Sequence, residues 1–164
     1  MSRRNDALLS PCGTWRYWLT RSWDDALAPL VVVGLNPSTA DAENDDPTIR
    51  RCIAFAKREG AGGLVMLNLF AFRATDPKEM KAVALASAER AIGPENDAHI
   101  MAQCAGARVV YAWGAHGKIL NRDYRIHRLI RPLAHSTLCL GKTQAGLPRH
   151  PLYLAANTPL EAFA

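Results

Sequence analysis

The sequence predicts an α/β protein with three layers, α/β/α, around a central, mostly parallel sheet of four strands. Four short apolar runs lead to this prediction, because each is rich in β-branched or aromatic residues and ends at turn residues. Their hydrophobicity is continuous instead of alternating, which is typical of strands buried on both faces of a parallel sheet. Helical segments separate the runs, and this alternation favours right-handed crossovers. The runs span residues 29–34, 63–69, 107–114 and 136–141.

Three helix starts are marked by a proline that follows a capping residue or a glycine. Asp46 and Asp76 can each cap a helix whose first residue is the next proline, and Gly93 precedes a third such proline. We therefore expect helices from residue 47 to about residue 59, from residue 77 onward and from residue 94 onward. Before the first run, residues 15–19 alternate and predict an edge strand.

A fourth helix is expected over about residues 115–130, because its isoleucines share one stripe. Lys118, Arg122 and Arg125 line the flank of that stripe. The segment belongs to a basic region, since the chain from His116 to His150 holds seven Lys and Arg residues against a single Asp. The net charge of the whole chain is +5, so the remainder is nearly neutral.

Such a basic region predicts an anionic partner, which would be a nucleic acid, most readily DNA, or a nucleotide. The alternative is a helix face whose charges are simply solvated. A loop punctuated by Gly and Pro after the fourth run adds further polar groups suited to phosphate contact. The residues expected to hold phosphates are Lys118, Arg122, Lys142, Thr143 and Arg149.

The size and composition of the chain indicate one soluble domain over residues 1–164. Hydrophobic residues make up 49% and charged residues 21%, which argues against disorder. No apolar run approaches the roughly 20 residues of a membrane helix, and the first residues lead into no signal-peptide core. We expect a cytoplasmic protein without membrane association and without an obligatory protein partner.

The cysteines and acidic residues predict no metal site and no cofactor. No two of the four cysteines form a Cys-x-x-Cys pair, so buried free thiols are expected. The acidic stretch of residues 41–46 lacks the pattern of a calcium loop, and helix capping explains it, with Asp41 or Asp45 at the edge of a site as the alternative. Phosphate-binding, dinucleotide, serine-hydrolase and zinc-protease motifs are absent from the sequence.

Candidate site residues follow the ends of the predicted strands, where ligands of such sheets bind. Asn36 follows the first strand and can orient a water or a ligand amide, or simply bond its own turn. Asn68 ends the second, and its amide matches the edge of a nucleobase unless backbone groups satisfy it. Ser38 is expected to line the same pocket, and Phe70 either stacks on a base or packs in the core.

Taken together, these segments resemble a bacterial family called domain of unknown function 1643, from about residue 15 to residue 154. The family name carries no activity. The matching segments are residues 34–40, 45–52, 68–77, 93–97 and 150–154.

At a greater distance, the order of motifs is similar to the uracil-DNA glycosylase superfamily. Residues 34–37 (Gly-Leu-Asn-Pro) fit its first motif, residues 66–68 (Met-Leu-Asn) its second, and the Trp113-Gly114 pair its third. The His150-Pro151 pair fits the start of the fourth motif, although no Ser follows and the pair comes late. This resemblance implies a uracil-DNA glycosylase-like fold.

The resemblance also implies roles for these residues. Asn36 would position the attacking water, Asn68 would read the base, and His150 would stabilise the departing base, with Lys142 or Thr143 as alternative donors. The expected function is hydrolysis of the N-glycosidic bond of a damaged or mispaired base in DNA. The alternatives are a non-catalytic nucleic-acid or nucleotide binding module and a hydrolase of free nucleosides or nucleotides.

Overall fold

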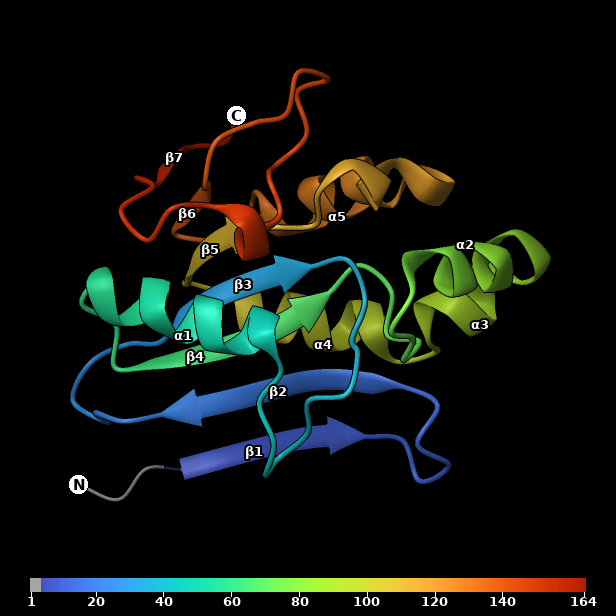
Figure 1. Cartoon of the computed structure of the whole chain (residues 1–164), viewed down its shortest axis with the longest axis horizontal. Helices are drawn as coiled ribbons and strands as arrows, with labels where there is room; N and C mark the ends of the chain where they lie inside the picture. The colour runs from blue at the N-terminus through green and yellow to red at the C-terminus, as the bar shows by residue number, and fades with distance from the viewer. Residues whose placement is uncertain (1–3) are drawn as a thin grey trace.

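A computed structural model describes residues 4–164 as one mixed sheet of seven strands with helices packed around it (Figure 1). The strand order is β1-β2-β4-β3-β5-β6-β7. The four predicted runs form the inner strands β4, β3, β5 and β6, which are all parallel. The strands span Arg4–Leu9 (β1), Arg16–Ser22 (β2), Leu30–Gly34 (β3), Gly63–Asn68 (β4), Arg108–Tyr111 (β5), Ser136–Cys139 (β6) and Glu161–Ala162 (β7).

The prediction of four strands was wrong, because three antiparallel strands extend the parallel group. β2 was expected at the edge, yet it pairs with β4 on one side and β1 on the other, and β1 forms that edge. At the opposite edge β7 pairs with β6. Two buried arginines, Arg16 and Arg21, interrupt the apolar pattern of β2, and β7 has only two residues, so neither strand has a strong sequence signal.

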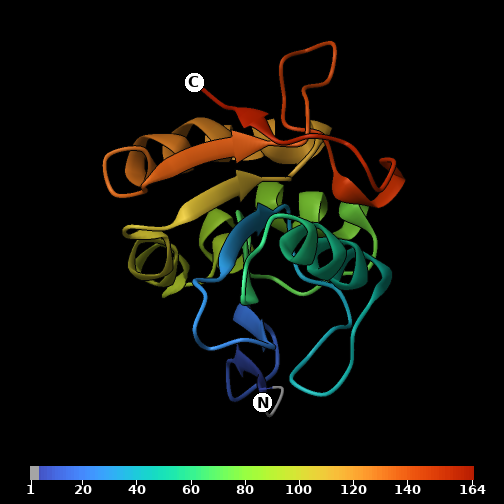
Figure 2. The same cartoon turned by 90° about the vertical axis from the view of Figure 1, so that its left-hand side faces the viewer.

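Helices cover both faces of the sheet (Figure 2). One face packs against α1 through residues such as Val32, and the other packs against α4 and α5 through its neighbours Val31 and Val33. This alternation explains the continuous apolar runs, since both sets of side chains are buried. The helices span Pro47–Arg58 (α1), Pro77–Ala86 (α2), Ala88–Ile92 (α3), Asn96–Cys104 (α4) and Arg122–Ile130 (α5), with 3₁₀ helices at Ala115–Asn121 (η1) and Pro151–Tyr153 (η2).

The capping residues were predicted correctly for α1 and α2. The side chain of Asp46 accepts from the backbone N–H of Ile49, and that of Asp76 accepts from Lys78. α4 begins shortly after Pro94, as expected, whereas the short helix α3 was not predicted.

The single helix expected over residues 115–130 is broken at its centre. Leu120 and Asn121 adopt positive φ angles of 55° and 58°, so the 3₁₀ helix η1 ends and α5 starts in a new direction. Asn tolerates this left-handed conformation better than most residues, and Leu rarely adopts it. As a consequence, the first residue of α5, Arg122, turns into the protein and is only 1% exposed.

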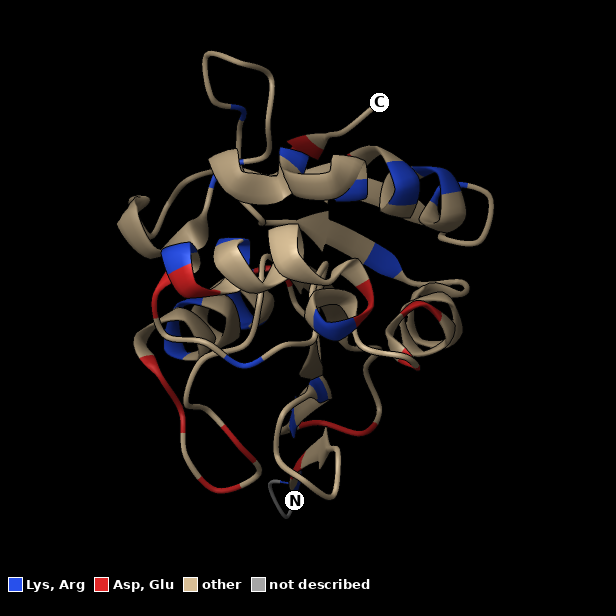
Figure 3. Ribbon diagram, turned by 90° about the vertical axis from the view of Figure 1, so that its right-hand side faces the viewer, with Lys and Arg blue, Asp and Glu red and all other residues tan. Residues whose placement is uncertain are grey.

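Charge is unevenly distributed over the surface. Several Lys and Arg residues (blue) lie on α5, whereas acidic residues (red) lie on the loop between β3 and α1, away from that helix (Figure 3). Among residues 4–164, no helix is long and apolar enough to cross a membrane. Cys52, Cys104 and Cys139 are buried free thiols as predicted, but Cys12 is exposed.

Candidate functional site

A cavity of about 550 Å³ lies at the carboxyl ends of β3, β4 and β5. The start of α1, the start of η1 and the segment around η2 complete its walls. Asn36, Ser38, Asn68 and His150, which the sequence analysis placed at the ends of separate strands, all line this cavity. The parallel order of the inner strands explains this, since it puts their carboxyl ends at one edge of the sheet.

The side chain of Asn36 is held in place through the nitrogen of its amide. Its Nδ2 donates to the carbonyl oxygens of Pro37 at 3.1 Å and Ala74 at 2.8 Å. No protein group in the described part of the chain donates to its Oδ1. The neighbouring turn and the distant segment at Ala74 therefore fix the orientation of the amide together, and Oδ1 is left as an acceptor for a ligand or a water.

The Nδ2 of Asn68 has no hydrogen-bond partner in the described residues, although the residue is only 2% exposed. Its Nδ2 is buried without a hydrogen-bond acceptor. The side chain points to the same side as Met66, where both approach the small residue Gly34. A buried amide without partners is costly, by about 1–3 kcal/mol, unless something outside the chain satisfies it.

Four hydrogen bonds hold the backbone around Asn68. Asn96 is fully buried, and its Nδ2 donates to the carbonyl oxygens of Asn68 at 3.0 Å and of Leu69 at 3.2 Å. Arg122 donates to the same Leu69 carbonyl and forms an ion pair with Asp97. These bonds fix the end of β4 and thereby the place of the unpaired amide.

His150 lines the cavity, and its Nε2 has no hydrogen-bond partner in the described residues. Its Nδ1 accepts from the backbone N–H of Leu152 at 3.2 Å, so the neutral ring carries its proton on Nε2. Burial lowers the pKa of His150, and the negative charge of Asp46 partly opposes that shift. The ring is therefore neutral at neutral pH and offers Nε2–H.

The chain can be compared with known proteins. The sequence profile of a family described as a protein of unknown function, DUF1643, matches residues 16–152. The chain belongs to this family. No curated protein and no solved structure matches the chain. With the exception of Tyr153, every residue that lines the cavity lies inside the DUF1643 segment.

Two of the predicted site residues of the DUF1643 segment have other roles. Phe70 was expected either to stack on a base or to pack in the core, and it is fully buried in the core. Arg122 was expected to hold a phosphate, but it is buried, because the break between η1 and α5 turns it toward Asp97 and Leu69.

The other predicted phosphate contacts lie outside the cavity. Lys118, Lys142 and Arg149 are exposed, and Thr143 is half-buried and accepts from the backbone N–H of Leu147. Lys118 follows His116 closely in η1, and Arg149 directly precedes His150, so both lie near residues that line the cavity. A role of these side chains in binding phosphates stays a prediction.

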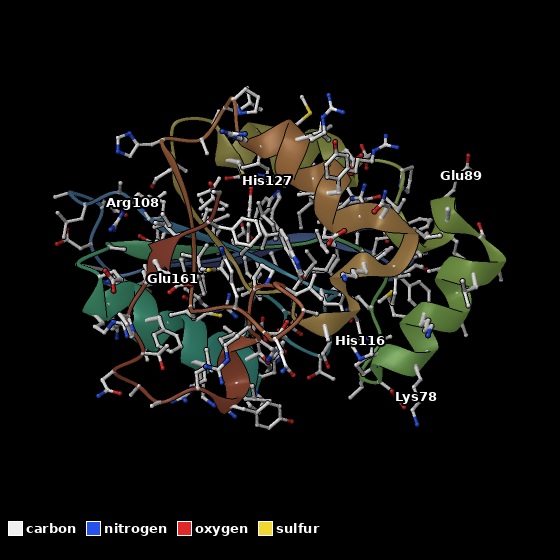
Figure 4. The ribbon with its side chains drawn as sticks, turned by 90° about the horizontal axis from the view of Figure 1, so that it is seen from above. Lys78, Glu89, Arg108, His116, His127 and Glu161 are labelled. Atoms are coloured by element: carbon white, nitrogen blue, oxygen red, sulfur yellow. The ribbon has the colours of Figure 1, made fainter. Side chains whose placement is uncertain are left out.

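Several residues that line the cavity were not predicted as site residues. Among them, Arg16 comes from β2, Asp46 caps α1, His116 lies in the first turn of η1 (Figure 4) and Tyr153 ends η2. Tyr153 is 88% exposed and gives the rim a flat aromatic surface. The aromatic residue shortly after the His150-Pro151 pair was the available sequence signal for Tyr153. Arg16, in contrast, looked like part of an alternating strand.

The cavity offers hydrogen-bonding groups and no evident metal site. Among residues 4–164, no three His, Cys, Asp or Glu side chains lie close enough together to hold a metal ion. A wider depression of about 920 Å³ lies elsewhere, between Trp15, α3 and Arg125. It contains none of the four predicted side chains that meet in the smaller cavity, which we therefore take as the candidate site.

Proposed function

We propose that the cavity binds a nucleobase and that the chain hydrolyses the N-glycosidic bond of a damaged or mispaired base in DNA. The observation that carries this proposal is the Nδ2 of Asn68, which is buried in a residue that lines the cavity and has no acceptor in the described chain. An amide offers a donor and an acceptor side by side, which is the pattern that reads the edge of a base. A bound base would remove the cost of leaving that amide unsatisfied.

Three of the polar side chains that line the cavity, those of Asn36, Asn68 and His150, suit the steps of this reaction. A water oriented by Asn36 Oδ1 attacks the anomeric carbon of the sugar, while the bond from that carbon to the base nitrogen breaks. The base leaves with the electron pair of this bond, and donation from His150 Nε2–H and Asn68 Nδ2 stabilises its negative charge. As the new carbon–oxygen bond forms, the water loses one proton, which passes to the departing base anion, so that the products are the neutral base and the sugar hydroxyl. An amide is not a strong base, so the rate acceleration comes from the orientation of the water. Turnover is therefore expected to be slow.

The surroundings of the cavity also support a nucleic-acid substrate. The exposed cations Lys118 and Arg149 lie next to lining residues in the sequence, where they can meet phosphates on either side of an extruded nucleotide. Tyr153 gives the rim an aromatic face on which a base can stack. The order of the strand-end motifs, which is similar to that of uracil-DNA glycosylases, agrees with this proposal.

A second candidate is hydrolysis of the same bond in a free nucleoside or nucleotide. One observation favours it: none of the residues predicted to hold DNA phosphates lines the cavity, and Arg122 is buried. A cavity of about 550 Å³ lies within the range of small-molecule sites.

The test is strand cleavage of labelled duplexes that carry uracil, hypoxanthine, xanthine or ethenocytosine opposite each normal base. Alkali then cuts the strand wherever a base has been removed, and Asn36→Ala is the matched variant. Scission by the wild type that the variant loses is the expected result. Duplex binding without scission would replace the proposal by a binding module, and release of bases from free nucleosides alone would favour the second candidate. If none of these substrates is bound or cleaved, the proposal is wrong.

A further inference from the structure

The wall of the cavity contains a buried cation that has almost no partners. Arg16 is 2% exposed and lines the cavity. Among the described residues, the one hydrogen bond of its side chain runs from Nη1 to the carbonyl oxygen of Ala40, at 2.9 Å. Its Nε is buried without an acceptor, and no carboxylate of the described chain lies within 4.0 Å of the guanidinium. A guanidinium has five donors, so this is an unusual arrangement for a buried arginine.

A β-bulge directs Arg16 toward the cavity. In the pairing of β1 with β2, Leu8 lies opposite Trp18 and Leu9 lies opposite Arg16, so Tyr17 is an extra residue in β2. The extra residue puts Arg16 on the α1 side of the sheet, where its side chain reaches Ala40 in the loop before that helix. Bulges often aim a side chain at a functional site in this way.

The free edge of the guanidinium has the geometry of an oxyanion receptor. Because Nη1 is occupied by Ala40, the remaining edge consists of Nε and Nη2, whose N–H groups are parallel and match two oxygens of a phosphate or carboxylate. Burial lowers the pKa of Arg16 to about 10, with Asp46 opposing the shift, so the side chain stays positive at neutral pH. Asp46 also lines the cavity, but one of its carboxylate oxygens accepts from Ile49 and caps α1.

The first turn of α1 adds donors to the same wall. Thr48 lines the cavity two residues after the capping residue Asp46, and no partner for its hydroxyl is found in the described chain. The start of a helix favours negative charge through its unpaired backbone N–H groups. Arg16 and the start of α1 therefore combine a buried full charge with partial positive charge.

We propose that Arg16 binds a phosphate group of the ligand, so that the cavity recognises a nucleoside phosphate instead of a base alone. This inference rests on the proposed function, since it takes Asn68 as the group that binds the base. Arg16 lies on β2, and its backbone N–H bonds to Ala71, three residues beyond Asn68. The base and phosphate sites are thus separate positions along one edge of the sheet. The phosphate comes from a free nucleotide or from the strand that carries the extruded base.

The experiment compares ligands that differ only in the phosphate. Affinities of the four 2′-deoxynucleosides, their 5′-monophosphates, inorganic phosphate and a short oligothymidylate are measured by calorimetry for the wild type and for Arg16→Gln. The matched control is Arg21→Gln, which removes another buried arginine of β2. Arg21 also bonds the loop before α1, but Asp45 pairs with it and it does not line the cavity. Arg16→Lys, which keeps the charge but lacks the paired edge, is a milder second variant.

For the wild type we expect monophosphates to bind roughly tenfold to hundredfold tighter than nucleosides, because charge-assisted hydrogen bonds are strong. Arg16→Gln should abolish this difference, Arg16→Lys should reduce it, and Arg21→Gln should preserve it. If the phosphate comes from the DNA strand, Arg16→Gln should weaken the binding of oligothymidylate more than it weakens the binding of the mononucleotides. That result also supports the inference.

Two results would overturn the inference. In one, nucleosides and every phosphorylated ligand bind equally well; in the other, both glutamine variants lose the preference to the same extent. Failure of the proposed function looks different, because nucleosides would then not bind and Asn68→Ala would change nothing. Inorganic phosphate would still bind the wild type in an Arg16-dependent manner in that case.

Discussion

Arg122 and Leu69, which are far apart in the sequence, are joined by two hydrogen bonds to one carbonyl oxygen. The Nη2 and Nε atoms of Arg122 lie 2.7 and 3.1 Å from the oxygen of Leu69. The same guanidinium contacts Asp97 at 2.7 Å, so it links α5, α4 and the end of β4. Arg122 is therefore a positioning residue for the strand end that carries Asn68.

Replacement of Arg122 should cost stability. Arg122→Met leaves the Leu69 carbonyl with fewer donors and Asp97 with one fewer cationic partner, and we expect a loss of about 2–4 kcal/mol in the free energy of unfolding. Urea denaturation measures this loss. Arg128→Met, an exposed position of the same helix, is the control and should change the free energy by less than about 0.5 kcal/mol. Equal effects of the two variants would contradict the assigned role.

Asn68 and Asn96 should respond in opposite ways to the same substitution. Asn68→Ala removes a buried amide without partners, so the free energy of unfolding should stay the same or rise, while nucleoside binding is lost. Asn96→Ala removes two buried hydrogen bonds and should cost about 1–3 kcal/mol. Denaturation and calorimetry on both variants check this pair. A clear loss of stability for Asn68→Ala would show that its amide has a structural partner.

A carboxylate should not substitute for the amide of Asn36. Its Nδ2 donates to two carbonyl oxygens, and Asn36→Asp would place an acceptor against both. We expect Asn36→Asp to cost about 1–2 kcal/mol of stability and more than Asn36→Ala, which leaves no repulsion. Strand cleavage by both variants should fall by roughly a hundredfold. Faster cleavage by Asn36→Asp would instead make position 36 a general base.

How much of this site the sequence revealed depends on the residue. Asn36 and Asn68 were predictable because they lie at the ends of buried strands, and parallel strands bring their ends together, whereas His150 was predicted from its resemblance to a known motif. Helix starts at Asp46 and Asp76 were predictable because capping is local chemistry. Both kinds of signal lie within a few residues of the feature that they predict.

Other parts of the site depend on long-range geometry. Arg16 reaches the cavity through a bulge in the pairing of β1 and β2, which no local pattern in the sequence marks. Arg122 looked like one of several basic residues on a helix face, and only the break at Leu120 and Asn121 turns it inward. Phe70 was ambiguous because an aromatic beside a strand end serves the core and a ligand equally well.

Cys12 should be the reactive thiol of this protein. Hydrogen bonds with the side chains of Ser10 and Thr14 lower its pKa to about 7, whereas burial raises the pKa of Cys52 and Cys104 to about 12. Iodoacetamide should therefore label Cys12 with a rate that rises through pH 7 and levels off above it, because the thiolate reacts. Mass spectrometry of tryptic peptides follows the labelling. Labelling of the buried cysteines at the same rate in the folded protein would contradict this prediction.

Acid should destabilise the fold partly through His150. Burial keeps the pKa of His150 below its ordinary value of about 6.5, so the unfolded chain takes up a proton at a higher pH than the folded one. The free energy of unfolding therefore falls as pH drops below about 6.5 and levels off below the lowered pKa. Protonation would also remove the acceptor that Nδ1 provides for Leu152.

Two variants isolate this contribution of His150. The difference in unfolding free energy between the wild type and His150→Gln should decrease toward acid pH within that window. Asp46→Asn keeps a capping side chain for α1 but removes the charge that raises the pKa of His150. In this variant, the pH range over which His150 protonation lowers the free energy of unfolding should therefore extend to lower pH. Denaturation series between pH 5 and 8 measure both curves. A pH-independent difference for His150→Gln would mean that the folded and unfolded chains protonate this ring alike, and that burial does not hold it neutral.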